Sequence, residues 1–118
     1  MSKMILKSTL ILSLFVFNVH AQSSLDKDSL ANQCYNLAHA VTDLVPSQQN
    51  TTCVDKLYMA STQMNAAGVL ISTNVSEAAK QIIDNAVSAL QFAELSGCNR
   101  FIQISHSKLE ANKLKHLL

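Results

Sequence analysis

Two helical patterns fill residues 53–98, which read CVDKLYMASTQMNAAGVLISTNVSEAAKQIIDNAVSALQFAELSGC. Apolar or small residues recur there at alternating steps of four and three, which is the spacing of one helical face. The first series is Cys53, Leu57, Ala60, Met64, Ala67 and Ile71, and the second is Val75, Ala79, Ile82, Ala86, Ala89 and Ala93. The stretch predicts a helical hairpin with a cysteine at each end.

Polar residues set the expected boundaries of this hairpin. Thr52 is followed three residues later by an acid, which is the pattern of an N-cap, so the first helix is expected from there to about Ser72. Asn74 repeats the pattern for the second helix, and Gly97 supplies its C-terminal stop. The short connection at Asn74 implies antiparallel neighbours.

One further helix is expected on each side of the hairpin. The first starts near residue 24 or 26, where acidic residues suit a helix N-terminus, and is stopped after residue 45 by Pro46. Its inward stripe is Leu30, Cys34, Leu37, Val41 and Leu44. The last helix spans about residues 99–115. The sequence thus predicts an all-α protein with a single up-down-up-down four-helix bundle.

The composition agrees with this fold class. The chain has two glycines, one proline and no tryptophan among 118 residues. Sheets with tight turns use glycine, β-branched and aromatic residues heavily, whereas this chain is rich in Ala, Leu and Ser. We therefore expect helices only.

The N-terminus has the three parts of a secretory signal peptide. Lys3 and Lys7 precede an apolar run over residues 10–17, and Val19-His20-Ala21 fits a cleavage site. The alternative is an uncleaved anchor, but a membrane span needs about 20 apolar residues. Cleavage after Ala21 makes residues 1–21 the signal peptide and residues 22–118 one helical bundle domain. We expect a secreted, extracellular protein, or a periplasmic one in a bacterium.

Charge restricts the class of partner. Loss of two lysines with residues 1–21 leaves seven basic against eight acidic residues, so the formal net charge changes from +1 to −1. A nearly neutral protein does not hold nucleic acid or an anionic membrane by bulk charge. The sequence also has no apolar run long enough for a membrane span after signal cleavage.

The three cysteines predict one disulfide and one odd thiol. In the expected bundle, Cys53 opens one helix of the hairpin and Cys98 follows the other, so both lie at the same end. Cys34 lies about eleven residues before the end of its helix, roughly 16 Å away at 1.5 Å per residue, which is beyond disulfide reach. We expect a Cys53–Cys98 bond. Cys34 is then either a buried, inert thiol or an intermolecular bridge that forms a homodimer.

Catalytic signatures are missing from the sequence. It contains no Cys-x-x-Cys, His-Glu-x-x-His or Gly-x-Ser-x-Gly motif, and its two glycines are too few for a phosphate loop. We expect neither an enzyme nor a cofactor. His39 and Asp43 lie four residues apart and His106 falls at a similar height, a spacing that permits a metal or haem site. Because His39 lies opposite the inward stripe, a solvated pair with Asp43 is the preferred interpretation, and no metal is expected.

Two further sets of residues are candidates for binding or modification. A bundle that is splayed at one end would offer an apolar ligand a lining formed by Leu37, Val41, Leu57, Met64, Ile83 and Leu90, although core packing is the commoner role of such residues. Asn50-Thr51-Thr52 and Asn74-Val75-Ser76 match the N-glycosylation pattern in expected loops. About one or two such triplets arise by chance, and the pattern matters only in a eukaryotic protein.

The layout of the chain resembles small secreted helical proteins of the insect male accessory gland. The features shared are a signal ending in Val19-His20-Ala21, then Cys34-Tyr35, Cys53 and Cys98 on helical segments poor in aromatic residues. The resemblance implies a non-enzymatic seminal-fluid component that acts by binding. We therefore expect a secreted helical protein that binds another protein. The alternative is an extracellular or periplasmic carrier of a small apolar ligand or haem.

Overall fold

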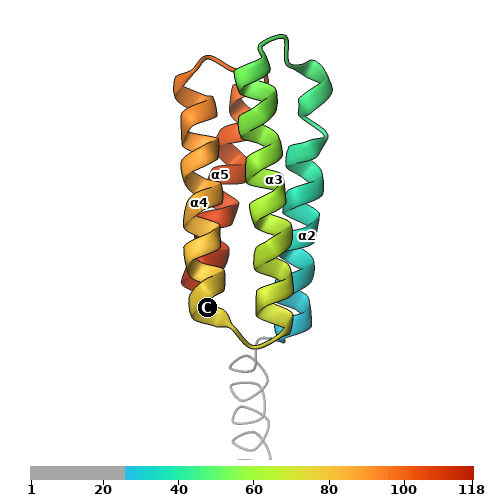
Figure 1. The fold of residues 1–118 in the computed structure, drawn as a ribbon, viewed down its shortest axis with the longest axis vertical. Helices are drawn as coiled ribbons and strands as arrows, with labels where there is room; N and C mark the ends of the chain where they lie inside the picture. The colour runs from blue at the N-terminus through green and yellow to red at the C-terminus, as the bar shows by residue number, and fades with distance from the viewer. Residues whose placement is uncertain (1–25) are drawn as a thin grey trace, which may run out of the picture.

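The computed structural model describes residues 26–118, so the predicted signal peptide lies outside the described residues. The elements are α2 (Lys27–Thr42), a short 3₁₀ helix η1 (Val45–Ser47), α3 (Thr51–Ser72), α4 (Ser76–Leu95) and α5 (Phe101–His116). Successive α-helices run in opposite directions, as Figure 1 shows, which confirms the all-α four-helix bundle. None of the helices within residues 26–118 combines the length and the hydropathy that crossing a membrane requires.

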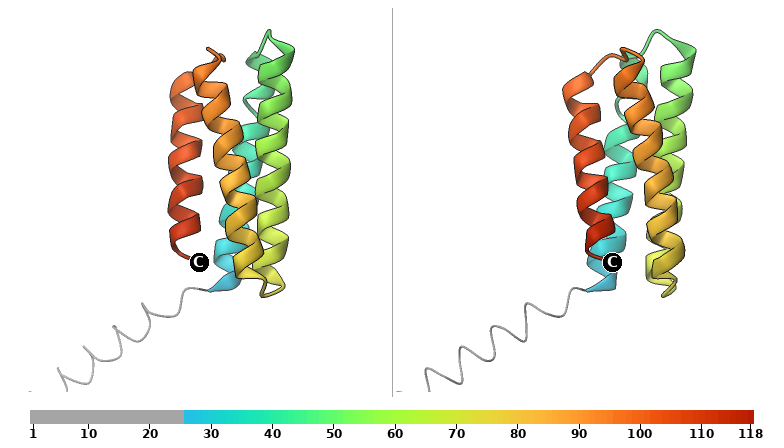
Figure 2. Two further views of the ribbon diagram at one scale, coloured as in Figure 1. Left: turned by 60° about the vertical axis from the view of Figure 1, so that its left-hand side comes forward. Right: turned by 90° about the vertical axis from the view of Figure 1, so that its left-hand side faces the viewer.

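The helices do not pack equally on all four sides of the bundle. Helix α3 packs closely against both α2 and α4, while α5 packs against α4 and more sparsely against α2. Figure 2 shows α5 at the edge of the bundle beside α4. The largest fully buried side chains are Leu57, Met64, Ile71, Ile83, Leu90 and Ile104. Alanines occupy many other buried positions, which lets neighbouring helices approach closely.

Two contacts fix how α2 lies on α3. Gly68 faces the ring of Tyr35 so closely that a Cβ atom at position 68 would overlap it. About two turns earlier on α3, the Ser61 hydroxyl donates a hydrogen bond to the carbonyl of Ala38 at 2.8 Å and lies 2.6 Å from the Thr42 hydroxyl. These buried polar groups are satisfied by one another, so they set the register of the helix pair without an unpaired donor.

The start of α3 differs from the sequence prediction by two residues. Asn50, and not Thr52, is the N-cap, because its Oδ1 accepts a hydrogen bond from the Thr52 backbone N–H at 2.8 Å. Asn and Thr are both good caps, and a sequence that offers the two in succession does not say which begins the helix.

The connection between α3 and α4 also corrects a predicted cap. Asn74 has a left-handed backbone with φ of 65° and ends α3, while Val75 occupies the N-cap position of α4. The backbone N–H of Val75 donates to Leu70 at 2.8 Å and that of Asn74 to Ile71 at 3.1 Å, which is a Schellman motif with Asn in place of Gly. A two-residue turn therefore replaces the expected capping box.

Two predictions of helical faces and ends were wrong in detail. Helix α2 ends at Thr42, three residues before the expected end, because Pro46 is accommodated in the 3₁₀ helix η1. Of the two adjacent isoleucines of α4, Ile83 is fully buried and Ile82 is half-buried. Val75, which the predicted series also includes, is exposed. Adjacent isoleucines fit either a step of three or a step of four from Ala79, so the sequence pattern alone does not choose between them.

Candidate interaction surface

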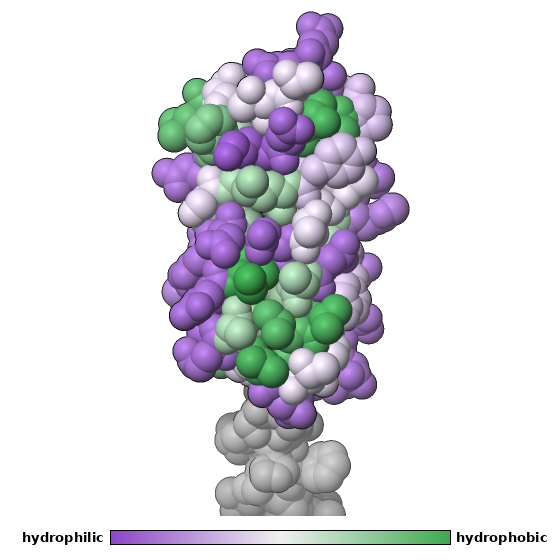
Figure 3. Space-filling view, viewed as in Figure 1, coloured by the Kyte–Doolittle hydropathy of each residue, from purple (hydrophilic) through white to green (hydrophobic). Residues whose placement is uncertain are grey.

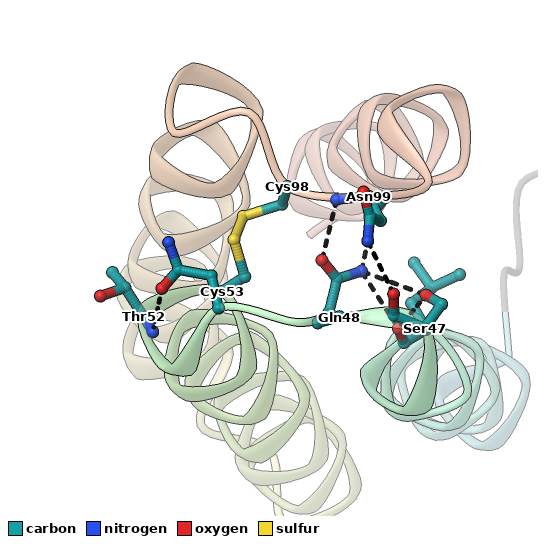
Figure 4. Close-up of a disulfide and its surroundings, with 8 residues drawn as sticks. Ser47, Gln48, Thr52, Cys53, Cys98 and Asn99 are labelled. Carbon is teal, nitrogen blue, oxygen red and sulfur yellow. Dashed lines mark hydrogen bonds between the residues drawn. A yellow bond between two sulfur atoms is a disulfide. The ribbon is translucent and has the colours of Figure 1, made fainter.

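The disulfide closes one end of the bundle, as the sequence predicts. Cys53 and Cys98 are bonded with a Cα–Cα separation of 5.6 Å. Beside them, in Figure 4, the Gln48 side chain donates to the Asn99 carbonyl at 2.7 Å and accepts from the Asn99 N–H at 2.8 Å. The Asn99 side chain donates to the Ser47 carbonyl at 2.8 Å. The bond and this network together tie the η1 loop and the α4–α5 turn to the start of α3.

Cys34 lies inside the core and takes no part in a disulfide. Burial raises the pKa of its thiol to about 11, so the thiolate that exchanges disulfides is scarce at neutral pH. Of the two roles open for Cys34, the structure supports the buried thiol and does not support a homodimer through this residue.

The residues expected to line a ligand cavity belong instead to the packed core. Leu37, Val41, Leu57, Met64, Ile83 and Leu90 are all buried. They fall in two clusters whose side chains fill the space between the helices. Leu37 also borders a surface groove, described next.

This groove lies between α2 and α5, where the helices pack most sparsely. It consists of two adjoining hollows of about 270 and 350 Å³ that share Ala40, His106 and Ser107. Leu44 and Ile102 make one hollow mostly apolar. The other hollow is bordered by Gln33, Asn36, Leu37, Glu110 and Leu114.

The histidines do not meet in one site. His39 has a side chain that is 81% exposed, with Nε2 3.8 Å from Asp43 Oδ2, while His106 lines the groove. Within residues 26–118 no three His, Cys, Asp or Glu side chains are grouped as metal ligands.

Charge is distributed unevenly between α5 and the rest of the bundle. Residues 100–118 contain four basic and one acidic residue, whereas residues 26–99 contain three basic and seven acidic ones. Lys108 lies 2.6 Å from Glu94 and Lys115 lies 2.8 Å from Asp84, so two lysines of α5 pair with acids of α4. Helix α5 is therefore held to α4 by complementary charge as well as by its apolar face.

Glu94 is the centre of the stronger of these contacts. Its side chain is only 11% exposed, and it accepts hydrogen bonds from Lys108 and from the Ser105 hydroxyl. The hydrogen bond from Lys108, followed by that from Ser105, lowers the pKa of Glu94 below its ordinary value. The carboxylate is thus ionised at neutral pH and joins the two helices near the disulfide end.

Four apolar side chains, one at the end of α4 and three on α5, face solvent, and we call this set the α4–α5 edge. It comprises Leu95 at the end of α4 and Phe101, Ile102 and Leu109 on α5, and all four are more than half exposed. Leu95 is 81% and Ile102 78% exposed. Sequence periodicity missed this edge because α5 carries apolar residues on its buried and its outward side alike.

A second apolar region is visible in Figure 3 at the lower ends of α3 and α4. At these helix ends Leu70 and Ile82 are half-buried and pack against the core, while Val69 and Val75 are 53% and 43% exposed. Their exposure is what a small bundle leaves uncovered, since much of any protein surface is apolar. The α4–α5 edge, by contrast, contributes side chains that the core does not use.

Comparison with known proteins adds no family to these observations. The chain matches no protein-family model, no curated protein and no solved structure. The function has to be inferred from the geometry above.

Proposed function

We propose that this chain is an exported, non-catalytic protein that binds another protein through the α4–α5 edge. The observation that carries the proposal is the exposure of Leu95 at the end of α4 and of Phe101, Ile102 and Leu109 on α5, a helix that already has a complete buried face. Apolar side chains grouped at a surface and bordered by polar residues are typical of protein interaction sites. The expected partner presents a complementary apolar surface.

The charges of α5 favour a protein partner over nucleic acid or an anionic membrane. Lys108, Lys113 and Lys115 each pair with a carboxylate of the same chain. Paired lysines contribute little to the field that attracts polyanions. Ile102 and Leu109 are exposed on α5 among polar residues, and these two side chains favour contact with an apolar surface.

Two side chains of the described residues have pKa values displaced from their ordinary values, and in both cases packing or hydrogen bonding within the fold is the cause. These displacements therefore support a role without catalysis. Cys34 is shifted by burial in the core and Glu94 by its hydrogen bonds to α5. Neither residue lines the groove between α2 and α5. A displaced pKa in a cleft would instead suggest an active site.

The proposal is tested with protein recovered from the fluid into which it is secreted. Seminal fluid is the first to examine, because of the resemblance in layout to male accessory gland proteins. We expect a mature N-terminus at Gln22 and a stoichiometric complex with a second protein in native mass spectrometry. The Ile102→Ser/Leu109→Ser double variant should lose the complex, while Val69→Ser, which changes an exposed residue of α3, should keep it.

Three outcomes would contradict the proposal. Protein that keeps residues 1–21 or stays in the cytosol would remove export. A complex that survives the double variant would move the interface away from the α4–α5 edge. Self-association that the double variant abolishes would make the edge a contact between copies of this chain.

The groove between α2 and α5 supports a second candidate function, the carriage of a small apolar ligand. Its more apolar hollow of about 350 Å³ is within the size range of ligand pockets and is lined by Leu44 and Ile102. Haem would need an iron ligand, and His106 is the histidine that borders the hollow. Native mass spectrometry and an absorbance scan of protein from its source would reveal a bound small molecule, and finding none would reject this candidate.

A further inference from the structure

The asparagines of the described chain differ in what their side chains do. Residues 26–118 contain eight asparagines, five in helices and three, Asn50, Asn74 and Asn99, outside them. The two glycosylation triplets start at Asn50 and Asn74, so both fall among these three. The atom that receives an N-glycan is the amide nitrogen Nδ2, so its hydrogen bonding is the property to compare.

Asn99 shows how a turn asparagine without the triplet is used. Its Nδ2 donates to the Ser47 carbonyl at 2.8 Å, so the amide nitrogen is engaged in the network beside the disulfide. Phe101 follows at the second position after it, where the triplet needs Ser or Thr. Asn99 is therefore a structural residue.

Asn50 differs from Asn99 because its side-chain oxygen, and not its nitrogen, makes the hydrogen bond. Its Oδ1 caps α3 by accepting from the Thr52 N–H, while its Nδ2 has no hydrogen-bond partner among residues 26–118. Asn50 and the two threonines after it are exposed, and the backbone of Asn50 is extended. Because a glycan is added to Nδ2 and leaves Oδ1 in place, the helix cap and the modification are compatible.

The side chain of Asn74 is free of hydrogen bonds at both its oxygen and its nitrogen within residues 26–118. Asn74 is exposed at the opposite end of the bundle, in the turn between α3 and α4. Only its backbone N–H is used, in the Schellman motif that ends α3. A sugar on Nδ2 would extend into solvent from the turn without displacing a contact.

We propose that Asn50 and Asn74 are N-glycosylation sites, one at each end of the bundle. This inference rests on the export in the proposed function, and it further requires a eukaryotic secretory pathway. The donor is an oligosaccharide linked to a lipid diphosphate. Nδ2 forms a bond to the anomeric carbon of the first sugar, the bond from that carbon to the diphosphate oxygen breaks, the lipid diphosphate leaves, and one amide proton passes to a base.

The experiment is secretion of the full chain, with its own N-terminus, from a eukaryotic cell. Secreted wild-type protein should carry two glycans, and a glycan-removing amidase that hydrolyses the Cγ–Nδ2 bond should leave Asp at positions 50 and 74 in the peptide map. Thr52→Ala and Ser76→Ala should each remove one glycan, and the double variant both. Thr52→Ser and Ser76→Thr keep the triplets, so these matched controls should keep both glycans.

The variants separate the modification from folding. Thr52→Ala keeps the backbone N–H that Asn50 caps, so loss of a glycan from it cannot be ascribed to loss of the helix cap. Secreted wild-type protein without a removable glycan would overturn the proposal while leaving export intact, and a glycan at only one position would overturn the other site. Protein retained in the cytosol would overturn the export on which both proposals depend.

Discussion

The α3–α4 hairpin and helix α5 are attached to the same core by different means. The hairpin buries a continuous series of side chains, is closed at one end by the Cys53–Cys98 bond, and has Lys56 stacked 4.6 Å from the ring of Phe92 on its surface. Helix α5 buries Ile104, Ser107, Ala111 and Leu114, pairs its lysines with α4, and leaves larger apolar residues outside. The hairpin exposes large apolar side chains too, among them Val69 and Leu95. The two regions therefore differ in how they are attached to the core and not in whether they expose apolar residues.

This difference in attachment leads us to expect different effects of substitution in the two regions. Helix α5 carries apolar residues on its outward side as well as on its buried side, so it has an apolar face that the chain does not cover. We infer that the hairpin carries most of the stability, and we propose that α5, together with Leu95 at the end of α4, carries the contact surface. Substitutions in the two regions should therefore differ in kind as well as in size.

Removal of the disulfide should have the largest effect. Closure of a loop of this length, 45 residues in sequence separation, stabilises a fold by about 4 kcal/mol in the chain-entropy model. The Cys53→Ala/Cys98→Ala variant should lose about that much free energy of unfolding in urea titrations. Cys34→Ala is the control, since it removes a buried sulfur without a bond and should cost only about 1 kcal/mol. Equal losses of free energy of unfolding in the two variants would show that the disulfide stabilises the fold no more than a single buried sulfur does.

Truncation of a leucine on α4 should depend on which side of the helix it occupies. Leu90 is fully buried, so Leu90→Ala should lower the free energy of unfolding by about 3 kcal/mol through lost burial and a cavity. Leu95 lies on the same helix and is 81% exposed. Leu95→Ala should change the free energy of unfolding by less than about 0.5 kcal/mol. A large loss from Leu95→Ala would place that residue in the core.

Replacement of Gly68 by alanine should destabilise the contact between α2 and α3 even though alanine favours the helix more than glycine does. Gly68→Ala adds about 1 kcal/mol of propensity but forces its Cβ into the Tyr35 ring, so we expect a net loss of about 1–2 kcal/mol in the free energy of unfolding. In a Tyr35→Ala background the same change should become stabilising. A double-mutant cycle by urea unfolding measures this reversal, and a Gly68→Ala effect that is the same in both backgrounds would rule out the contact.

Acid should weaken the attachment of α5 more than the hairpin. The pKa of Glu94 is lower in the folded protein than in the unfolded chain, so its contribution is complete above the unfolded value of about 4.3 and is lost as the pH falls through the lower, folded value. Glu94→Gln should cost about 1 kcal/mol at pH 7 and remove this part of the acid dependence. An unchanged pH profile of unfolding in Glu94→Gln would show that the pair does not stabilise the fold.

Much of the fold could be predicted from the sequence because it depends on the spacing of apolar residues along each helix and on the distance that a disulfide can span. The four-and-three spacing from Cys53 to Ile71 defined α3, and the position of Cys34 along its helix excluded it from the disulfide. Helix ends were harder, since Asn50 and Thr52 are both competent caps and Asn74 serves a Schellman turn as readily as a capping box. Such choices between near-equal local structures are made by packing.

The candidate interaction surface could not be predicted in the same way. In α5, Ile102 and Ile104 lie two residues apart, and only the docking of α5 on α4 turns one inward and the other outward. The ion pairs that set this docking, Glu94 with Lys108 and Asp84 with Lys115, join residues distant in sequence. A pattern search therefore sees apolar residues in α5 without telling which of them the core leaves free.

The free energy of unfolding of the Ile102→Ser/Leu109→Ser variant is the most direct test of the claim that the α4–α5 edge is reserved for a partner and not used by the fold. Both side chains are more than half exposed and lie outside the core, so urea unfolding of the isolated variant should match the wild type within about 0.5 kcal/mol. A loss of about 2 kcal/mol or more, the size expected for buried apolar residues, would show that these side chains stabilise the bundle itself and would contradict the claim.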